Sequence, residues 1–360
     1  MNGWPKAVTP VLSYSKRQTH MHGSTKVRFI IRIWLTSLIL LFSAGCRQQQ
    51  QAVALYVDAV TLKETDQNNK AIEKLNAAVK SNERFSLAHS LLGEIYQEIK
   101  DYEKSAASYK KAIELNPWSF KNHFNLGCDY LTMEKFALAA KAYSRACELK
   151  PDHLGAHINA TICYYKIRDY NKALTYGKRA EQIDPSADKI QYLLGDIYAF
   201  QKNYDQAIAA YKRALEIDSH NPEIVTSLAV AYIESKRYKP AKELLEFVIQ
   251  IQPRNNTAYR HLGYCYLQFD ELDAVDKAIE SYNKAIEIDN KDWRAHRGLG
   301  FAYMLSARNK NDDVLRIKAI KQWRLSLAIK PDQPQRETLL KLIDKYFEEG
   351  ASAVRPDFCP

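Results

Sequence analysis

A tyrosine recurs at intervals of 34 residues along most of this 360-residue chain, and only the last interval is longer. The column comprises seven residues: Tyr96, Tyr130, Tyr164, Tyr198, Tyr232, Tyr266 and Tyr303. Alanine columns run in step with it, for example at Ala173, Ala207 and Ala241. Such a period predicts many copies of one small unit, each stacked on the next, rather than one globular core.

The copy from 188 to 221 shows what one unit contains. It reads as two helices joined by a tight turn near 202–204. Each helix has small and apolar residues on one side: Leu194, Gly195 and Tyr198 on the first, and Ala207, Tyr211 and Ala214 on the second. These spacings place each set on one helical face. Neither helix can bury that face alone, so each unit requires neighbours.

The repeated pattern resembles the tetratricopeptide repeat, in which small, aromatic and proline positions recur at fixed offsets within 34 residues. The residues that carry the resemblance are Leu92-Gly93-Tyr96, Leu126-Gly127-Tyr130, Leu194-Gly195-Tyr198 and Leu262-Gly263-Tyr266, with Pro117, Pro151, Pro185 and Pro253 at helix ends. The resemblance implies an all-α, right-handed superhelical solenoid of about eight helix-turn-helix units. Within residues 52–333 we place them at 52–85, 86–119, 120–153, 154–187, 188–221, 222–255, 256–292 and 293–333.

Some units depart from the pattern at the small and aromatic positions. The first unit has Ala59 and Leu62 in place of glycine and tyrosine. The unit that begins at residue 154 has Thr161 at the glycine site and Gly177 at the aromatic site, and the unit that follows 188–221 has Ala229 at the glycine site. We expect these units to pack as helix pairs like the others.

The last two units are longer than the rest, and a further helix follows them. Extra residues lie around Phe269–Asp276 and Ser306–Lys318, and we expect both insertions in the turn between paired helices. A solenoid needs a cap over its final repeat. Residues 334–350 read as that capping helix, with an apolar side made of Leu339, Leu340, Ile343 and Phe347. The tail 351–360 is expected to be disordered.

The N-terminal segment 1–45 has the features of a targeting signal. Val27 to Arg32 is basic and apolar, Ile33 to Phe42 is uncharged and mostly apolar, and Ser43-Ala44-Gly45 precede Cys46. Small residues before a cysteine resemble a bacterial lipobox, which implies removal of the signal and lipid on Cys46. The alternatives are an uncleaved anchor helix and an ordinary signal peptide.

Each of these alternatives places the repeats outside the cytoplasm, because basic residues flank the apolar stretch. Residues 46–51 read as the lipidated cysteine and a polar spacer. Many lipoproteins that stay at the inner membrane carry aspartate after the cysteine, so Arg47 favours the outer membrane in a Gram-negative cell. Met21 offers a second start site, in which case residues 1–20 are a mis-assigned extension.

The composition and motifs argue against nucleic acid, catalysis and cofactors. Of the formal charge of +10, residues 1–45 contribute +6, so the repeats carry only a mild excess. That excess is too small for a nucleic-acid footprint. The sequence contains no G-x-S-x-G, no H-E-x-x-H and no glycine-rich phosphate loop. We therefore expect no enzyme activity, no cofactor and no small-molecule substrate.

Histidines recur in register in several units: His89, His123, His157 and His296. Stacked helices separate equivalent positions by about 8–10 Å, whereas zinc requires nitrogens about 2.0–2.1 Å from one ion. We therefore expect these histidines to pack rather than to bind metal. The six cysteines form no C-x-x-C pair, which indicates free thiols. A bridge between Cys128 and Cys163 is the alternative.

In this repeat family the first helix of each unit lines an inner groove. From Phe124 onward, a second stripe on these helices is mostly apolar, and a continuous apolar patch indicates a binding site. The alternative is that neighbouring first helices hide part of the stripe. The predicted partner contacts are Phe124, Ile158, Tyr165, Tyr192, Arg260, Tyr264, Arg297 and Phe301. Its aromatic residues would anchor the partner, and its arginines would hold an acidic group.

We therefore expect a non-enzymatic scaffold in the bacterial cell envelope that captures a segment of a protein partner. Relatives with this layout include pilus-assembly and envelope adaptor lipoproteins. The alternatives are an accessory of a glycosyltransferase or of a secretion machinery, a signal-anchored membrane repeat protein, and a cytoplasmic co-chaperone. Such co-chaperones grip a carboxylate with lysine and asparagine, whereas other residues stand at those sites here: Ser90, Glu94, Phe124 and Cys128.

Overall fold

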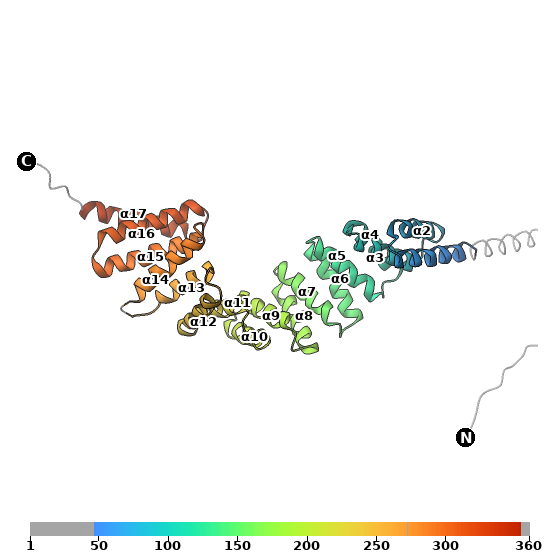
Figure 1. The fold of residues 1–360 in the computed structure, drawn as a ribbon, viewed down its shortest axis with the longest axis horizontal. Helices are drawn as coiled ribbons and strands as arrows, with labels where there is room; N and C mark the ends of the chain where they lie inside the picture. Colours follow the sequence, from blue (N-terminus) through green and yellow to red (C-terminus); the bar gives the residue numbers. More distant parts are fainter. Residues whose placement is uncertain (1–46, 272, 354–360) are drawn as a thin grey trace, which may run out of the picture. The chain divides into compact units, whose positions relative to one another are not determined.

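In the computed structural model, residues 47–271 and 273–353 are described, and every regular element in those ranges is a helix (Figure 1). The predicted all-α class is therefore confirmed. The chain divides into two compact units, one that ends at Pro117 and one that begins at Trp118. The predicted signal, Cys46 and the tail beyond Ala353 lie outside the described residues.

The described part of the first unit consists of helices joined by short turns. Residues 47–64 are helical, and three further helices follow: α2 (Asn68–Ser81), α3 (Ser86–Glu98) and α4 (Tyr102–Leu115). Ala59 and Leu75 are fully buried in one apolar cluster with Leu92 and Ile95 of α3. The atypical first repeat therefore packs as a helix pair, as its neighbours do.

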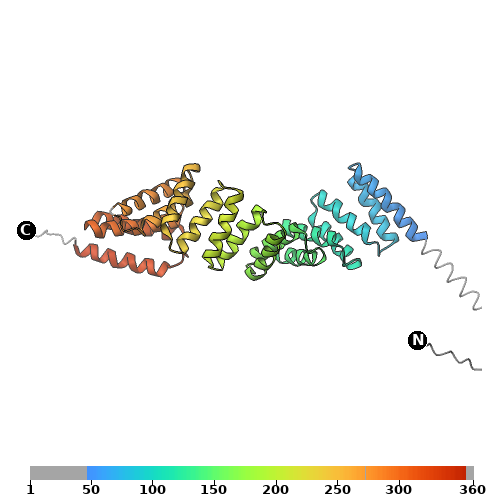
Figure 2. The same ribbon diagram turned by 90° about the horizontal axis from the view of Figure 1, so that it is seen from below.

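The second unit continues the same alternation. Its helices are α5 (Phe120–Thr132), α6 (Phe136–Leu149), α7 (Leu154–Lys166), α8 (Tyr170–Ile183), α9 (Asp188–Phe200), α10 (Tyr204–Ile217), α11 (Pro222–Glu234), α12 (Tyr238–Ile251), α13 (Asn256–Tyr266), α14 (Ala274–Ile288), α15 (Trp293–Lys310), α16 (Asp313–Ile329) and α17 (Arg336–Ala353). Consecutive helices lie side by side in both views (Figure 2). The first helices α7, α9, α11, α13 and α15 also contact one another in succession, so they form one continuous face.

A left-handed residue closes the turn inside most of the helix pairs. Lys202 has a φ of 60°, and its N–H donates to the carbonyl of Ala199 at 2.9 Å. The N–H of Asn203 donates to the carbonyl of Tyr198 at 2.8 Å. This Schellman arrangement ends the first helix and satisfies its last carbonyls. The positive φ recurs in register at non-glycine residues: Asp66, Lys100, Glu134, Arg168, Lys202 and Lys236.

In most helix pairs a small residue on one helix faces a large residue on the other, which we call a size exchange. It sets how closely the two helices approach. A Cβ atom on Gly195 would lie 2.5 Å from Cδ1 of Tyr211, so the tyrosine ring occupies the space that a side chain at 195 needs. Other pairs repeat the exchange with different sizes: Gly93 with Tyr109, Gly127 with Tyr143, Thr161 with Gly177, Ala229 with Leu245, Gly263 with Tyr282 and Gly300 with Trp323. At the atypical pair the small residue is Gly177 on the second helix, and side chains of both Thr161 and Leu194 approach it.

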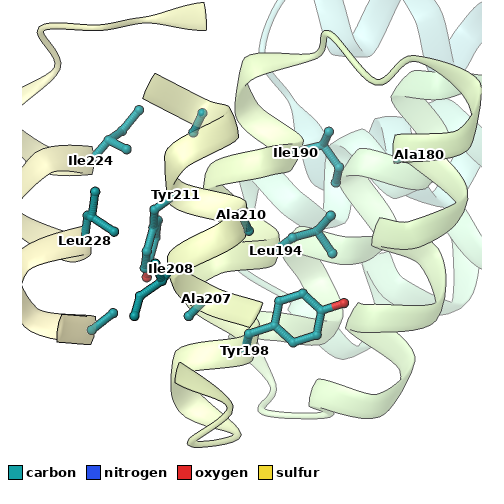
Figure 3. Packing of buried hydrophobic residues seen from close by; sticks show 12 residues of the cluster. Ala180, Ile190, Leu194, Tyr198, Ala207, Ile208, Ala210, Tyr211, Ile224 and Leu228 are labelled. Carbon is teal, nitrogen blue, oxygen red and sulfur yellow. The ribbon is translucent and has the colours of Figure 1, made fainter. Parts of the chain in front are cut away.

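Figure 3 shows how successive pairs join. Side chains from α8, α9, α10 and α11 meet in one buried cluster, which includes Ala180, Ile190, Leu194, Tyr198, Ala207, Ile208, Ala210, Tyr211, Ile224 and Leu228. The α9–α10 pair thus buries apolar surface against α8 before it and α11 after it. Stability in such a stack depends mainly on nearest-neighbour contacts.

The two predicted insertions differ in where they lie. α13 ends at Tyr266 and α14 begins at Ala274, so the first insertion lies in the turn as expected. The expectation for the second is wrong, because α15 continues to Lys310 and α16 begins at Asp313. The extra residues lengthen both helices instead. Ser306 is 2% exposed, so the added turn of α15 has a surface to pack against.

The capping helix α17 differs from the expectation in its end and in one contact. It runs to Ala353 rather than ending at Gly350. Of its expected apolar contacts, Phe347 is 56% exposed, while two others are buried in a cluster with Trp323: Leu339 and Ile343. Phe347 is therefore a surface residue at this end of the stack.

Candidate functional site

Two adjoining cavities lie along the face formed by the first helices of the second unit. The larger, of about 680 Å³, is called here the arginine cavity, and its lining includes Arg260, His261, Tyr264, Arg294, Arg297 and Phe301. The smaller, of about 330 Å³, is called the acidic cavity, and its lining includes Asp196, Phe200, Tyr204, Tyr211, Ser227 and Glu234. Because Glu234 lines both, the two cavities adjoin at this residue.

Two aromatic residues form apolar walls of the arginine cavity. Tyr264 is 42% exposed and Phe301 is 41% exposed. The ring of Tyr264 lies 6.3 Å from that of Tyr238, and the ring of Phe301 lies 5.2 Å from that of Trp323, both edge to face. Each ring is therefore supported by a second aromatic side chain while much of its surface stays open to solvent. Such supported aromatics are common anchors in protein interfaces.

Arg260 is engaged in an ion pair within the chain. Its Nη1 lies 2.6 Å from Oδ2 of Asp292, and the two side chains are 18% and 4% exposed. The other carboxylate oxygen of Asp292 accepts the backbone N–H groups of Arg294 and Ala295 at the start of α15. The charge of Arg260 thus compensates a buried carboxylate, which leaves it little capacity for a partner's acidic group.

Arg294 and Arg297 present the remaining positive charge of the cavity. Their guanidinium carbons lie 4.4 Å and 5.0 Å from the ring centroid of Trp293. Arg297 also donates to the carbonyl of Pro334 at 3.3 Å. Partial burial and the charge of Arg294 lower the pKa of Arg297, but an arginine remains protonated in proteins. Neither guanidinium pairs with a carboxylate in the described ranges, so both are available to an anion.

His261 adds a polar group that carries no charge at neutral pH. Burial, and secondarily the charge of Arg260, lower the pKa of His261 to about 4. Nη2 of Arg260 lies 3.5 Å from Nε2 of His261, which is consistent with a neutral imidazole that accepts from the guanidinium. The cavity therefore owes its positive charge at neutral pH to arginine alone.

Hydrogen bonds between tyrosines and a carboxylate organise the acidic cavity. The hydroxyl of Tyr211 donates to Oδ1 of Asp196 at 2.7 Å, and the hydroxyl of Tyr165 donates to the same carboxylate. Burial raises the pKa of Asp196 in spite of these two bonds. The ring of Tyr192 lies 5.9 Å from that of Tyr211. The predicted contacts Tyr165 and Tyr192 thus lie beside this cavity and support its polar floor.

The structure places the eight predicted contacts in three groups. Arg260, Tyr264, Arg297 and Phe301 line the arginine cavity together. Tyr165 and Tyr192 adjoin the acidic cavity. The remaining two lie in neither cavity: Phe124 packs among Phe120, Tyr143 and His153, and Ile158 packs against the buried cluster of Figure 3.

Several cavity residues were not among the predicted contacts. Asp196 lies on the same stripe of α9 as the predicted contact Tyr192, which is four residues before it, and lines the acidic cavity. Phe200 is 58% exposed at the end of α9, one position beyond the stripe. Glu234 has the same place at the end of α11. The last residues of α9 and α11 therefore contribute to the site in addition to the predicted stripe.

The recurring histidines bond to backbone of the preceding segment. Nε2 of His157 lies 3.1 Å from the carbonyl of Pro151, and Nε2 of His296 lies 3.1 Å from that of Asn290. Cys128 and Cys163 are free thiols. Among residues 47–271 and 273–353, no cluster of three or more histidine, cysteine or acidic side chains could hold a metal ion. Over the same ranges, no helix combines the length and apolar character needed to cross a membrane.

Comparison with protein-family profiles identifies the repeat. Profiles described as tetratricopeptide repeat or TPR repeat match residues 86–119, 124–188, 201–262 and 271–306. The matches fall on the helix pairs of both units and agree with the predicted repeat. No curated protein matches the chain in sequence.

Solved structures share the architecture at low sequence identity. The C-terminal part of a TPR repeat-containing protein from Cytophaga hutchinsonii is 17% identical, with 69% of this chain and 98% of that chain covered and a TM-score of 0.52. YrrB, a TPR protein with an unusual peptide-binding site, is 21% identical, with 57% and 99% covered and a TM-score of 0.45. Pseudomonas aeruginosa pilF is 19% identical, with 58% and 94% covered and a TM-score of 0.46. At 17% identity, the similarity to the Cytophaga hutchinsonii protein shows only that the fold is shared.

Proposed function

Since this chain belongs to the tetratricopeptide-repeat family, it is a protein-interaction scaffold, and we propose that it binds a segment of a protein partner along the face of α9, α11, α13 and α15. Apolar side chains of the segment rest against Tyr264 and Phe301. An acidic group of the segment pairs with Arg297, supported by Arg294. The scaffold carries out no chemistry on its partner.

The observation that carries this proposal is the make-up of the arginine cavity. It combines two supported, half-exposed aromatic rings with two arginines that meet no carboxylate in the described chain. Aromatic anchors with arginine beside them are the residues that contribute most to protein interfaces. Arg297 is also partly held by the Trp293 ring and the Pro334 carbonyl, so little side-chain freedom is lost when it binds.

We also propose that the scaffold works in a bacterial cell envelope, anchored through lipid on Cys46. The support is in the sequence: basic residues, an uncharged apolar stretch and small residues before the cysteine, all within residues 27–46. Helical structure is present from residue 47 onward, so the spacer to the first repeat is short. The partner would accordingly be a component of an envelope or pilus-type assembly.

Capture of the partner with variants of the cavity tests the binding proposal. The full chain is used to isolate partners from envelope extracts, and the affinity of the recovered protein is measured by calorimetry. Tyr264→Ala and Phe301→Ala should each weaken binding by more than about 1 kcal/mol, because each removes an aromatic anchor.

Leu138→Ala is the matched control. Leu138 lies on α6, is 43% exposed and lines neither cavity. Circular dichroism shows whether each variant remains folded. If the folded cavity variants bind as tightly as the parent while Leu138→Ala does not, the binding surface lies on the second helices and the proposal is wrong.

A further inference from the structure

The acidic cavity has a composition opposite to that of its neighbour. Two carboxylates, Asp196 and Glu234, line it together with the aromatic side chains of Phe200, Tyr204 and Tyr211. The hydroxyls of Tyr211 and Tyr204 donate to Asp196 and Glu234 at 2.7 Å and 3.4 Å. These donors are neutral, so no cation in the described part of the chain compensates either carboxylate at this site.

Phe200 is an exposed aromatic ring that the protein holds in place. It is 58% exposed, yet its ring stacks on that of Tyr170 at 5.3 Å and meets that of Tyr165 edge to face at 5.5 Å. Tyr165 in turn donates to Asp196. The open ring face and the carboxylate are thus fixed relative to each other through one tyrosine.

A carboxylate beside a fixed aromatic ring suits a cationic side chain. An ammonium or guanidinium group gains a charge-assisted hydrogen bond from the carboxylate and a cation–π contact from the ring. An acidic or purely apolar side chain would leave the half-buried carboxylate of Asp196 uncompensated. Charge complementarity therefore selects one kind of occupant for this cavity.

We propose that the acidic cavity binds a lysine or arginine side chain of the partner segment whose acidic group lies at Arg297. This inference rests on the proposed function and adds the charge pattern of the partner segment. Because Glu234 lines both cavities, the two subsites adjoin. A bound segment therefore presents a basic side chain over α9 and α11 and an acidic group over α13 and α15.

Selection from a random peptide library tests the charge pattern without a known partner. A library of short displayed peptides with random sequences is selected for binding to the full chain and to each variant. The selected sequences are then compared with the starting library. The parent should enrich peptides that contain both a basic and an acidic residue at a recurrent separation. Asp196→Asn and Phe200→Ala should each lose the basic enrichment but keep the acidic one. Arg297→Gln should do the reverse.

Affinities of one selected peptide then quantify the effect. Asp196→Asn should weaken binding by about tenfold or more, since a charged partner is lost from a partly buried pair. Glu216→Gln, an exposed carboxylate on α10 outside both cavities, should change little. Phe200→Ala removes an exposed ring, so this variant should remain folded. It tests the subsite independently if Asp196→Asn fails to fold.

The outcomes separate this inference from the proposed function. Selected peptides that bind at the arginine cavity but show no basic enrichment would overturn the acidic subsite and leave the proposed function intact. Enrichment that survives in both Asp196→Asn and Phe200→Ala would also overturn it. If no peptide is selected by the folded parent, both proposals are contradicted.

Discussion

The guanidinium of Arg260 lies 2.6 Å from the carboxylate of Asp292, and this ion pair joins α13 to the start of α15. Arg260 belongs to α13, whereas Asp292 is the residue before α15 and accepts two of its first N–H groups. The carboxylate is 4% exposed, so its charge depends on these partners. The two predicted arginines of the cavity therefore have different roles: Arg260 supports the fold, and Arg297 is available to a ligand.

Arg260→Ala should destabilise the chain far more than Arg297→Ala. Loss of Arg260 leaves a buried carboxylate without its cation, which costs about 3 kcal/mol. Arg297 pairs with no carboxylate in the described ranges, so its loss should cost less than about 1 kcal/mol. Amide hydrogen exchange over residues 256–305 measures both effects.

Binding should respond in the opposite way to the same two substitutions. Arg297→Gln should weaken the capture of an acidic partner segment by about 1–3 kcal/mol while the protein remains as stable as the parent. If Arg260→Gln weakens binding more than Arg297→Gln at temperatures where both are folded, the assignment of roles is reversed.

His261 should make the stability of this region depend on pH. Its pKa is about 4 in the folded chain, below its ordinary value of 6.5. Between these values the unfolded chain binds more protons, so stability is complete above pH 6.5 and falls as the pH drops toward 4. The loss attributable to this residue is up to about 3 kcal/mol. Urea unfolding of the parent and of His261→Gln at several pH values isolates the contribution of His261. If the free energy of unfolding changes equally with pH in both proteins, the pH dependence does not come from His261.

The repeat architecture could be predicted because packing imposes it on every unit. A tyrosine next to a small residue can recur at 34-residue intervals only if each copy meets the same neighbours. At residues 161 and 177 the pattern is reversed, because the small residue, Gly177, lies on the second helix, and Leu194 of the next helix pair approaches it. The place of the second insertion could not be predicted, because the polar residues of an exposed helix and of a turn have similar sequence patterns. The longer α15 and α16 form because neighbouring helices offer a surface against which they pack.

The site could be predicted only in part, because spacing along one helix does not reveal partners on another. The stripe located Tyr264 and Phe301, but nothing near Arg260 in the sequence indicates that Asp292 pairs with it 32 residues later. Phe124 has the same helical position as the cavity residues, yet it is covered by Phe120 and His153. In the sequence Phe200 is one more apolar residue, and only the fold shows that its ring is exposed to solvent.

Cys46, which lies outside the described residues, should carry lipid in the mature protein. The basic, apolar and small residues before it predict that residues 1–45 are removed. Intact-mass measurement of the protein purified from membranes should show the shortened chain with acyl groups. A retained N-terminus or an unmodified Cys46 would contradict the anchor. If the anchor is lipid, less of the Cys46→Ser variant than of the parent should be found in the membrane fraction.

Lys202→Gly should stabilise the unit that contains it. Lys202 is exposed and has a φ of 60°, a conformation that costs a residue with a Cβ atom about 1–2 kcal/mol. Part of that gain is offset by the greater freedom of glycine in the unfolded chain, so the expected net gain is about 0.5–1 kcal/mol. Lys202→Ala is the control, because it removes the same side chain and keeps the Cβ atom; a gain as large in the control would show that the side chain, not the backbone, is the cause.

Gly195→Leu should force α9 and α10 apart, because even a Cβ atom at 195 would lie 2.5 Å from the ring of Tyr211. Overpacking of this kind costs about 1–3 kcal/mol or more. Protection from hydrogen exchange should fall mainly in residues 188–221 and in the adjacent helix pairs, since stacked repeats depend on their neighbours. A uniform loss of protection through both units would contradict nearest-neighbour stacking.

A double-mutant cycle tests whether the size exchange itself sets the approach of the paired helices. Gly195→Ala alone should be destabilising by clash, and Tyr211→Leu alone should be destabilising because it leaves space and removes the hydrogen bond to Asp196. Together they recreate the buried pair that the next unit has at Ala229 and Leu245. The double variant should therefore be more stable than the sum of the single changes predicts, by about 0.5–3 kcal/mol. Additive effects would mean that the ring of Tyr211 can move aside, and that the alternation of sizes does not control how closely α9 and α10 pack.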